Sequence, residues 1–304
     1  MKLGFFTAPF PGKPMEEVAA WAAANGFESL EIACWPPMKA DRRYAGVTTI
    51  DVTDLTPSKA QEIHGILERY GLIISSLGYY PNPLTPDAEQ RETMISHLKK
   101  VIQAAELLNV PIVGTFVGKY KNKTVPANLD EFAKVWPPIV RFANEHGVKI
   151  AIENCPMIFS YDEWPGGNNL ANTPAIWRQM WEIIPDTNFG LNLDPSHRIY
   201  QMIDYVRVVR EFKDRIFHVH AKDLRIDREG LYNHGILSAG MGWQIPVLPG
   251  FGEVDWSKFI GALYSVGYDY VISIEHEDRA FEKTEDLVKR GFLIARDALR
   301  PYIK

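Results

Sequence analysis

Short apolar runs rich in β-branched and aromatic residues alternate with longer segments of helical periodicity along the chain. Eight runs are candidate strands: Leu3 to Thr7, Ser29 to Ala33, Ile73 to Leu77, Ile112 to Phe116, Lys149 to Glu153, Phe189 to Asp194, Ile216 to His220 and Tyr270 to Glu275. Strands that alternate with helices are typical of repeated βα units around a parallel sheet. We therefore expect an α/β fold, a (β/α)8 barrel.

Several of the intervening segments carry helix signals. Residues 14–17 open an alanine-rich segment that Gly26 closes, and Thr173 with Pro174 predicts an N-cap and first helical residue before residues 176–184. The amphipathic stretch 200–210 predicts another helix.

The three longest segments without clear periodicity are 34–58, 154–172 and 221–253. All three follow strands, which places them on the C-terminal face of the barrel, where barrel enzymes carry their chemistry. No composition shift marks a linker, so we expect residues 1–304 to form one catalytic domain.

Composition narrows the class of protein. A net charge of −5 gives no attraction to polyanions, which argues against a nucleic-acid partner. The two cysteines, Cys34 and Cys155, lack the spacing of a disulfide framework or a thiolate zinc site and fit a reducing cytoplasm. No run predicts a signal peptide or a membrane partner, so we expect a cytoplasmic protein, and the sequence leaves open whether it forms a homo-oligomer.

Four candidate strands end in a side chain that can bind a metal: Glu153, Asp194, His220 and Glu275. If the last four strands are neighbours, these side chains converge at the mouth of the barrel. A single carboxylate at a strand end is more often a helix cap or an ion-pair partner. Four together would repel one another unless a cation neutralised them. The pattern predicts one divalent ion; the oxygen-rich set favours Mn²⁺, Mg²⁺ or Co²⁺, and Zn²⁺ remains compatible.

Other polar residues lie near the same mouth. His197 is placed to hydrogen-bond a substrate oxygen, and His218 lies one layer deeper, either as a partner of a ligand or as a satisfied core histidine. For Glu31, Lys222 and Asp223 we weigh substrate contact or orientation of the ligands against structural ion pairing. Aromatic residues that would form either a sugar-binding wall or ordinary packing are Phe6, Trp35, Tyr79, Phe116 and Trp164.

Together these motifs resemble the xylose-isomerase-like superfamily of TIM barrels, specifically its sugar phosphate isomerase/epimerase group, over nearly the whole chain. The motifs that carry the resemblance are residues 26–31, 152–154, 192–197, 218–223, 250–256 and 274–275. The resemblance implies that Glu153, Asp194, His220 and Glu275 bind the metal and that Glu153 and Glu275 also act as general acid and base. A metal that chelates a carbonyl and its neighbouring hydroxyl stabilises an enediolate, while a carboxylate on each face exchanges the proton.

Two departures from related patterns bear on the substrate. The ketose 3-epimerases carry an arginine six residues after the metal histidine, whereas Ile226 stands there and Arg225 precedes it. The endonuclease IV pattern needs further zinc ligands, but Ser75, Thr115 and 227–229 occupy the corresponding regions, which argues against a nuclease.

The leading hypothesis is a metal-dependent isomerase or epimerase of a free, oxidised or otherwise modified sugar. No glycine-rich loop or basic cluster indicates a phosphate site, which favours a non-phosphorylated substrate. The alternative shares the proton abstraction but expels a β-substituent, as a lyase on a 3-keto-glycoside or an inosose dehydratase would. The long segments after the fifth and seventh strands favour this larger substrate. A sugar-binding barrel without activity would not need two carboxylates flanking a metal.

Overall fold

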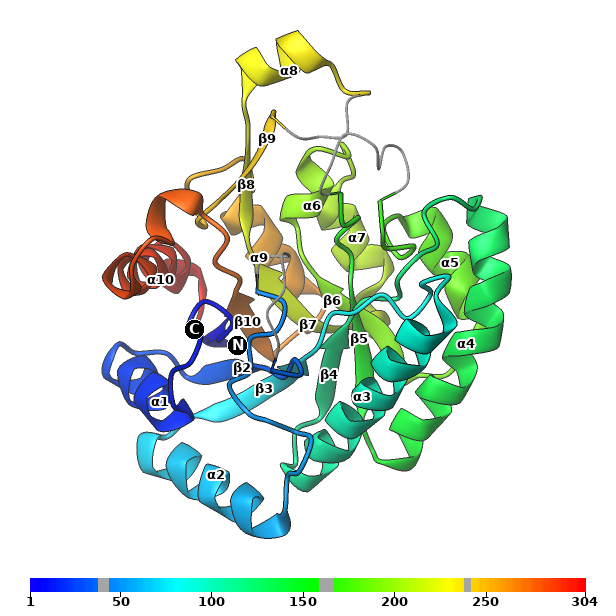
Figure 1. Cartoon of the computed structure of the whole chain (residues 1–304). Coiled ribbons are helices and arrows are strands. Elements are labelled where there is room, and N and C mark those ends of the chain that lie inside the picture. Colours follow the sequence, from blue (N-terminus) through cyan, green and yellow to red (C-terminus); the bar gives the residue numbers. More distant parts are fainter. Residues whose placement is uncertain (38–43, 159–166, 238–241) are drawn as a thin grey trace.

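The computed structural model describes residues 1–37, 44–158, 167–237 and 242–304. Within these residues eight parallel strands close a barrel in the order β1-β10-β7-β6-β5-β4-β3-β2 (Figure 1). The strands are β1 Lys2–Phe6, β2 Ser29–Ala33, β3 Ile73–Gly78, β4 Ile112–Thr115, β5 Lys149–Glu153, β6 Phe189–Leu193, β7 Ile216–Ala221 and β10 Val271–Ile274. The predicted (β/α)8 barrel is confirmed, with every candidate strand in it.

Helices surround the strands (Figure 1). They are α1 Met15–Ala24, α2 Pro57–Tyr70, α3 Ala88–Leu107, α4 Val125–Glu145, α5 Pro174–Ile183, α6 Ser196–Ile199, α7 Tyr205–Glu211, α9 Trp256–Ser265 and α10 Glu285–Leu299, with 3-10 turns at Lys213–Arg215, Arg279–Phe281 and Arg300–Tyr302. The expected starts of α1 and α5 are confirmed: Thr173 caps α5 by accepting a hydrogen bond from the Ile176 amide. None of the described helices is long and apolar enough to cross a membrane.

The predicted continuous helix over 200–210 is wrong at its start. The chain forms the short α6, breaks, and begins α7 at Tyr205. The cause is Asp204, whose carboxylate accepts hydrogen bonds from the amides of Val206 and Arg207 at 2.9 and 3.0 Å and so caps a new helix.

The segment 221–253 is an arm with its own secondary structure and not an irregular loop. It contains β8 Asp223–Ile226, α8 Arg228–His234 and β9 Gln244–Val247, and β8 pairs with β9 in antiparallel register. This arm projects from the barrel with α8 at its tip, in yellow at the top of Figure 1. It therefore extends the mouth of the barrel beyond the strand ends.

The barrel interior is polar around one level and apolar elsewhere. Aromatic rings fill the layer between β1 and the helices, where Phe5 lies 4.9 Å from Phe27 and 4.5 Å from Phe292 between ring centroids. Inside the barrel, by contrast, Glu31 and His218 are fully buried. Buried ionisable groups need partners, so the part of the barrel interior around Glu31 and His218 is a candidate functional site.

Candidate metal centre

Four neighbouring strands bring the predicted metal-binding side chains to one end of the barrel. β5, β6, β7 and β10 are consecutive in the sheet; Glu153 ends β5, Asp194 follows β6, His220 lies on β7 and Glu275 follows β10. A cavity of about 1250 Å³ opens at this end, and Glu153 and Glu275 line it. The expected convergence is thus present.

Glu153, His220 and Glu275 form the tightest part of this cluster. One carboxylate oxygen of each glutamate and one nitrogen of the imidazole all lie within 4.8 Å of one another. His220 Nδ1 lies 3.3 Å from Glu275 Oε2 and 4.0 Å from Glu153 Oε1. It accepts or donates no hydrogen bond within the described part of the chain. A buried nitrogen without a hydrogen bond, facing two carboxylates, has the position of a metal ligand.

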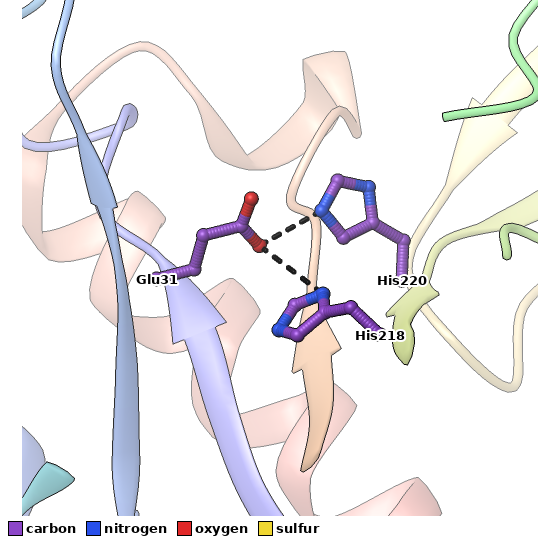
Figure 2. Close-up of side chains that lie close together, drawn as sticks. All are labelled: Glu31, His218 and His220. Atoms are coloured by element: carbon purple, nitrogen blue, oxygen red, sulfur yellow. Dashed lines mark hydrogen bonds and ion pairs between the residues drawn. The ribbon is translucent and has the colours of Figure 1, made fainter. Parts of the chain in front are cut away.

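Glu31 fixes the orientation of the His220 ring. His220 Nε2 donates a hydrogen bond of 2.8 Å to Glu31 Oε2 (Figure 2). Tyr80 and Ser273 donate to the same carboxylate at 2.6 and 2.9 Å. Burial alone would lower the pKa of His220, but Glu31 and Glu275 raise it well above its usual value. Nδ1 therefore faces Glu153 and Glu275 with a proton that a bound cation would displace. Metal-binding histidines commonly have such a carboxylate behind them.

His218 lies beside this pair and is satisfied by hydrogen bonds. Its Nδ1 bonds to Asn192 Oδ1 at 3.0 Å and its Nε2 to Ser75 Oγ at 3.1 Å. Burial lowers the pKa of His218 to about 4, so the ring is neutral at pH 7. The group Glu31, His218 and His220 in Figure 2 is therefore a hydrogen-bond network that supports the site, and not itself an ion site.

Asp194 contributes a second buried atom without a hydrogen bond, in addition to His220 Nδ1. Its main chain is fastened by Asn154, whose Oδ1 accepts from the Asp194 amide at 2.7 Å and whose Nδ2 donates to the Asp194 carbonyl at 2.9 Å. Asp194 Oδ1 accepts from the Ser196 amide at 2.8 Å, while Oδ2 accepts no hydrogen bond from any described residue. Asp194 Oδ2 and His220 Nδ1 are thus two buried atoms without hydrogen bonds that could bind a cation.

Lys222 is surrounded by carboxylates. Its Nζ lies 2.6 Å from Glu275, 3.2 Å from Asp194, 3.2 Å from Glu277 and 3.9 Å from Glu153, and the side chain is only 3% exposed. Burial alone would lower the pKa of Lys222, but these carboxylates raise it well above its usual value. One ammonium cannot balance the four carboxyl groups once they are ionised, and a divalent ion among them would supply the remaining positive charge.

The pKa values of Glu153 and Glu275, which both line the cavity, are shifted in opposite directions. Burial, with the nearby charge of Glu275, raises the pKa of Glu153 well above its usual value. Burial would also raise the pKa of Glu275, but Lys222 and His220 together hold it below its usual value. Two carboxyl groups with opposite protonation preferences can act as acid and base.

His197 lines the cavity next to these groups. Its Nε2 lies 3.2 Å from Asp194 Oδ2 and 3.5 Å from Glu153 Oε1 without hydrogen-bond geometry. Burial, and then the charge of Lys222, lowers its pKa well below the usual value, so the ring is neutral. Cys155 lies close by, but burial raises the pKa of its thiol and keeps it protonated, which makes it a poor ligand.

Two residues predicted to contact substrate are placed elsewhere. Glu31 is fully buried with its carboxylate engaged by three donors, which favours the orienting role over substrate contact. Asp223 is also fully buried and accepts from three amides and the Trp256 indole, so it is structural. Glu31 lies in the middle of β2 and Asp223 begins β8, and protein donors occupy the lone pairs of both carboxylates. Lys222, Arg225 and His197 do line the cavity.

The aromatic candidates divide in the same way. Phe6, Trp35 and Phe116 line the cavity, whereas Tyr79 packs between Trp35 and His97, with ring centroids 4.9 and 4.7 Å away. Trp164 lies outside the described residues.

Three contributors were not singled out from the sequence: Tyr80, which supports Glu31, Asn154, which holds Asp194, and Glu277, which faces Lys222. Asn154 and Glu277 follow strand-end residues that were singled out, so their position is a usable signal. Tyr80 lies two residues beyond β3, and nothing local reveals its partner on β2.

Comparison with known proteins agrees with this architecture. The family described as xylose isomerase-like TIM barrel matches residues 19–298. Protein YfiH of Bacillus subtilis (strain 168) is 28% identical, with 91% of this chain and 93% of YfiH covered. The fold is similar to the IOLI protein with a bound zinc atom (TM-score 0.71, 18% identity, 100% of both chains). It is also similar to D-psicose 3-epimerase with D-tagatose from Clostridium cellulolyticum H10 (TM-score 0.68, 16% identity, 100% of both chains).

Proposed function

Because this chain belongs to the xylose isomerase-like TIM-barrel family, we propose that it is a divalent-metal-dependent enzyme of the sugar phosphate isomerase/epimerase group. It removes a proton from a carbon next to a carbonyl in a sugar, forms an enediolate, and returns the proton as an isomerase or epimerase. The epimerase with D-tagatose among its structural relatives is consistent with a sugar substrate.

The observation that carries this proposal is the pairing of Glu153 with Glu275 across His220 at the edge of the cavity. Two carboxyl groups at the edge of one cavity can remove a proton from the substrate and return it. Glu275 would accept the carbon-bound proton through a carboxylate oxygen, and Glu153 would donate a proton from its carboxyl group.

The residues that would hold the ion are Glu153, Asp194, His220 and Glu275. The fit rests on His220 Nδ1 and Asp194 Oδ2, which are buried without hydrogen bonds, and on the excess of carboxylates around Lys222. Three carboxylates and one imidazole suit Mn²⁺, Mg²⁺ or Co²⁺, with Mn²⁺ the first choice and Zn²⁺ compatible. When bound, the ion would stabilise the negative charge that develops on the substrate oxygens.

Side chains around the pair would position the substrate. His197, held neutral by burial, would hydrogen-bond a substrate oxygen through Nε2. Lys222 would donate to an oxygen next to the reacting carbon while remaining paired with Glu275. Arg225 lines the cavity from β8 and would contact the far end of the substrate.

The size of the cavity supports a second reaction that begins with the same proton abstraction. Ligand cavities are typically about 300–1000 Å³, and the 1250 Å³ here exceeds what a single hexose fills. With a larger substrate, the electron pair left by proton removal would expel a β-substituent with its bonding electrons, and an acid would protonate that group. The enzyme would then be a lyase on a 3-keto-glycoside or a dehydratase of an inosose.

Proton exchange followed by NMR tests both outcomes. Protein loaded with Mn²⁺ and protein stripped with EDTA are incubated in D₂O with ketoses, inososes and 3-keto-glucosides. We expect metal-dependent deuterium incorporation next to a carbonyl, and an epimer, an isomer or a released substituent identifies the reaction.

Variants test the acid–base pair. Glu153→Gln and Glu275→Gln should each abolish exchange, whereas Glu62→Gln, on the exposed face of α2, should match wild type. Exchange retained by both active-site variants would refute the acid–base assignment.

A further inference from the structure

We propose that the outer part of the cavity binds an aryl group attached to the sugar, so that the substrate is an aryl glycoside whose sugar ring carries a ketone. This inference rests on the proposed function for the reacting end, but it concerns a different set of residues. The outer part is bounded by the arm and by two phenylalanines that the acid–base chemistry does not use: Phe251 and Phe281.

The cavity has two ends of different chemistry. Glu153, Lys222 and Glu275 line one end. The arm, which projects beyond the strand ends (Figure 1), lines the other with Leu224 and Ile245 to Val247, together with Arg225 and Gln244. A sugar ring bound at the acidic end would place its substituent against this mostly apolar wall.

Phe251 is a half-exposed aromatic side chain in this wall. Its side chain is 49% exposed, and its ring centroid lies 6.4 Å from that of Phe281, with 43° between the planes. The two rings form one apolar face on the cavity. Leaving such a face in water costs free energy, and a flat apolar ligand that covers it recovers that cost.

The loop that carries Phe251 is held rigidly. Asp223 Oδ2 accepts from the Gly250 amide at 3.0 Å and its Oδ1 from the Val254 amide at 3.0 Å, on either side of Phe251. Gly252 packs so closely that an added Cβ would lie 2.2 Å from Asp223 Oδ1. Phe251 is thus fixed by its backbone in a position that exposes it to the cavity.

The turn that carries Phe281 is joined to the same loop. Asp278 Oδ2 accepts from the Leu248 amide at 3.2 Å, and its Oδ1 accepts from the Ala280 amide at 2.9 Å. Both rings are therefore held in a fixed relative position. A preformed aromatic surface loses little entropy on binding, which is typical of a recognition site for an aromatic ring.

Binding of matched glycosides tests the inference without any need for turnover. The affinities of Mn²⁺-loaded protein for phenyl and methyl glycosides of glucose, galactose and mannose are measured by calorimetry. We expect the phenyl member of at least one pair to bind about 10-fold more tightly. Phe251→Ala should reduce that preference to about 2-fold or less, and Phe251→Leu should give an intermediate value.

Tyr302→Ala is the matched control, because Tyr302 is 41% exposed and does not line the cavity within the described residues. It should keep the wild-type preference. Equal affinities within every pair, or a preference that survives in Phe251→Ala, would overturn the inference. Because the assay measures binding only, a phenyl preference without proton exchange would refute the proposed chemistry alone, and exchange on free sugars without a phenyl preference would refute this inference alone.

Discussion

His220 on β7 donates a hydrogen bond of 2.8 Å to Glu31 on β2, a strand that is not its neighbour in the barrel. The two residues are 189 positions apart in the sequence, and the bond fixes the orientation of the imidazole ring. It leaves Nδ1 of His220 facing Glu153 and Glu275. The barrel interior thus holds the imidazole in an orientation that suits metal binding.

Glu31→Gln should weaken metal binding. Loss of the carboxylate behind a metal histidine typically costs roughly 10- to 100-fold in affinity, so we expect a loss of that size for Mn²⁺ by isothermal titration calorimetry. Glu62→Gln on the exposed face of α2 is the control and should bind as wild type does. An unchanged dissociation constant in a folded Glu31→Gln protein would show that Glu31 does not act through His220.

The sequence predicted the convergence of Glu153, Asp194, His220 and Glu275 because barrel topology alone places the ends of consecutive parallel strands together. It left open whether Glu31 and Asp223 contact substrate, orient the ligands or form structural ion pairs. What distinguishes a ligand from a structural carboxylate is whether hydrogen-bond donors of the protein already occupy its oxygens. Such donors come from distant segments, for example Ser273 for Glu31, and strand periodicity carries no information on them.

The arm was missed for a different reason. Its strands, Asp223–Ile226 and Gln244–Val247, are four residues each, and Pro246 lies in the second. Proline within a run counts against a strand, although an edge strand tolerates it. A pair this short is marginally stable alone, so its pairing depends on packing at the mouth of the barrel and not on local pattern.

Arg225→Ala should raise KM and change kcat little. Arg225 is exposed, lines the cavity from β8, and lies apart from the acid–base pair, so it should contribute binding that is equal in the ground state and the transition state. We expect KM to rise about 10-fold in steady-state kinetics, in line with the loss of one charge-assisted hydrogen bond. Arg210→Ala on α7 should leave both constants unchanged. A fall in kcat of the same size would instead assign Arg225 to the transition state.

Asp223→Asn should destabilise the fold and disturb the Phe251 loop. The asparagine side chain keeps only one acceptor oxygen. The buried Gly250 amide and Trp256 indole, which donate to Asp223 Oδ2, therefore lose a partner. We expect a decrease of about 2 kcal/mol in the free energy of unfolding, measured in urea. Asp130→Asn on the exposed face of α4 should change it by less than about 0.5 kcal/mol. Wild-type stability of Asp223→Asn would return Asp223 to the substrate-contacting role.

Lys222→Met should make stability depend on the metal. Without the ammonium, the carboxylates of Asp194, Glu275 and Glu277 face one another, and breaking a buried ion pair costs about 3 kcal/mol. We expect that loss in EDTA, and a smaller loss in saturating Mn²⁺, because a divalent ion among the same carboxylates supplies the missing charge. Urea unfolding under both conditions measures the difference. Lys258→Met, which removes an exposed pair with Asp255, should leave the free energy of unfolding nearly unchanged in either condition. An equal loss with and without Mn²⁺ would mean that the lysine and the ion do not share these carboxylates, and the proposed metal site would then have to lie elsewhere in the cavity.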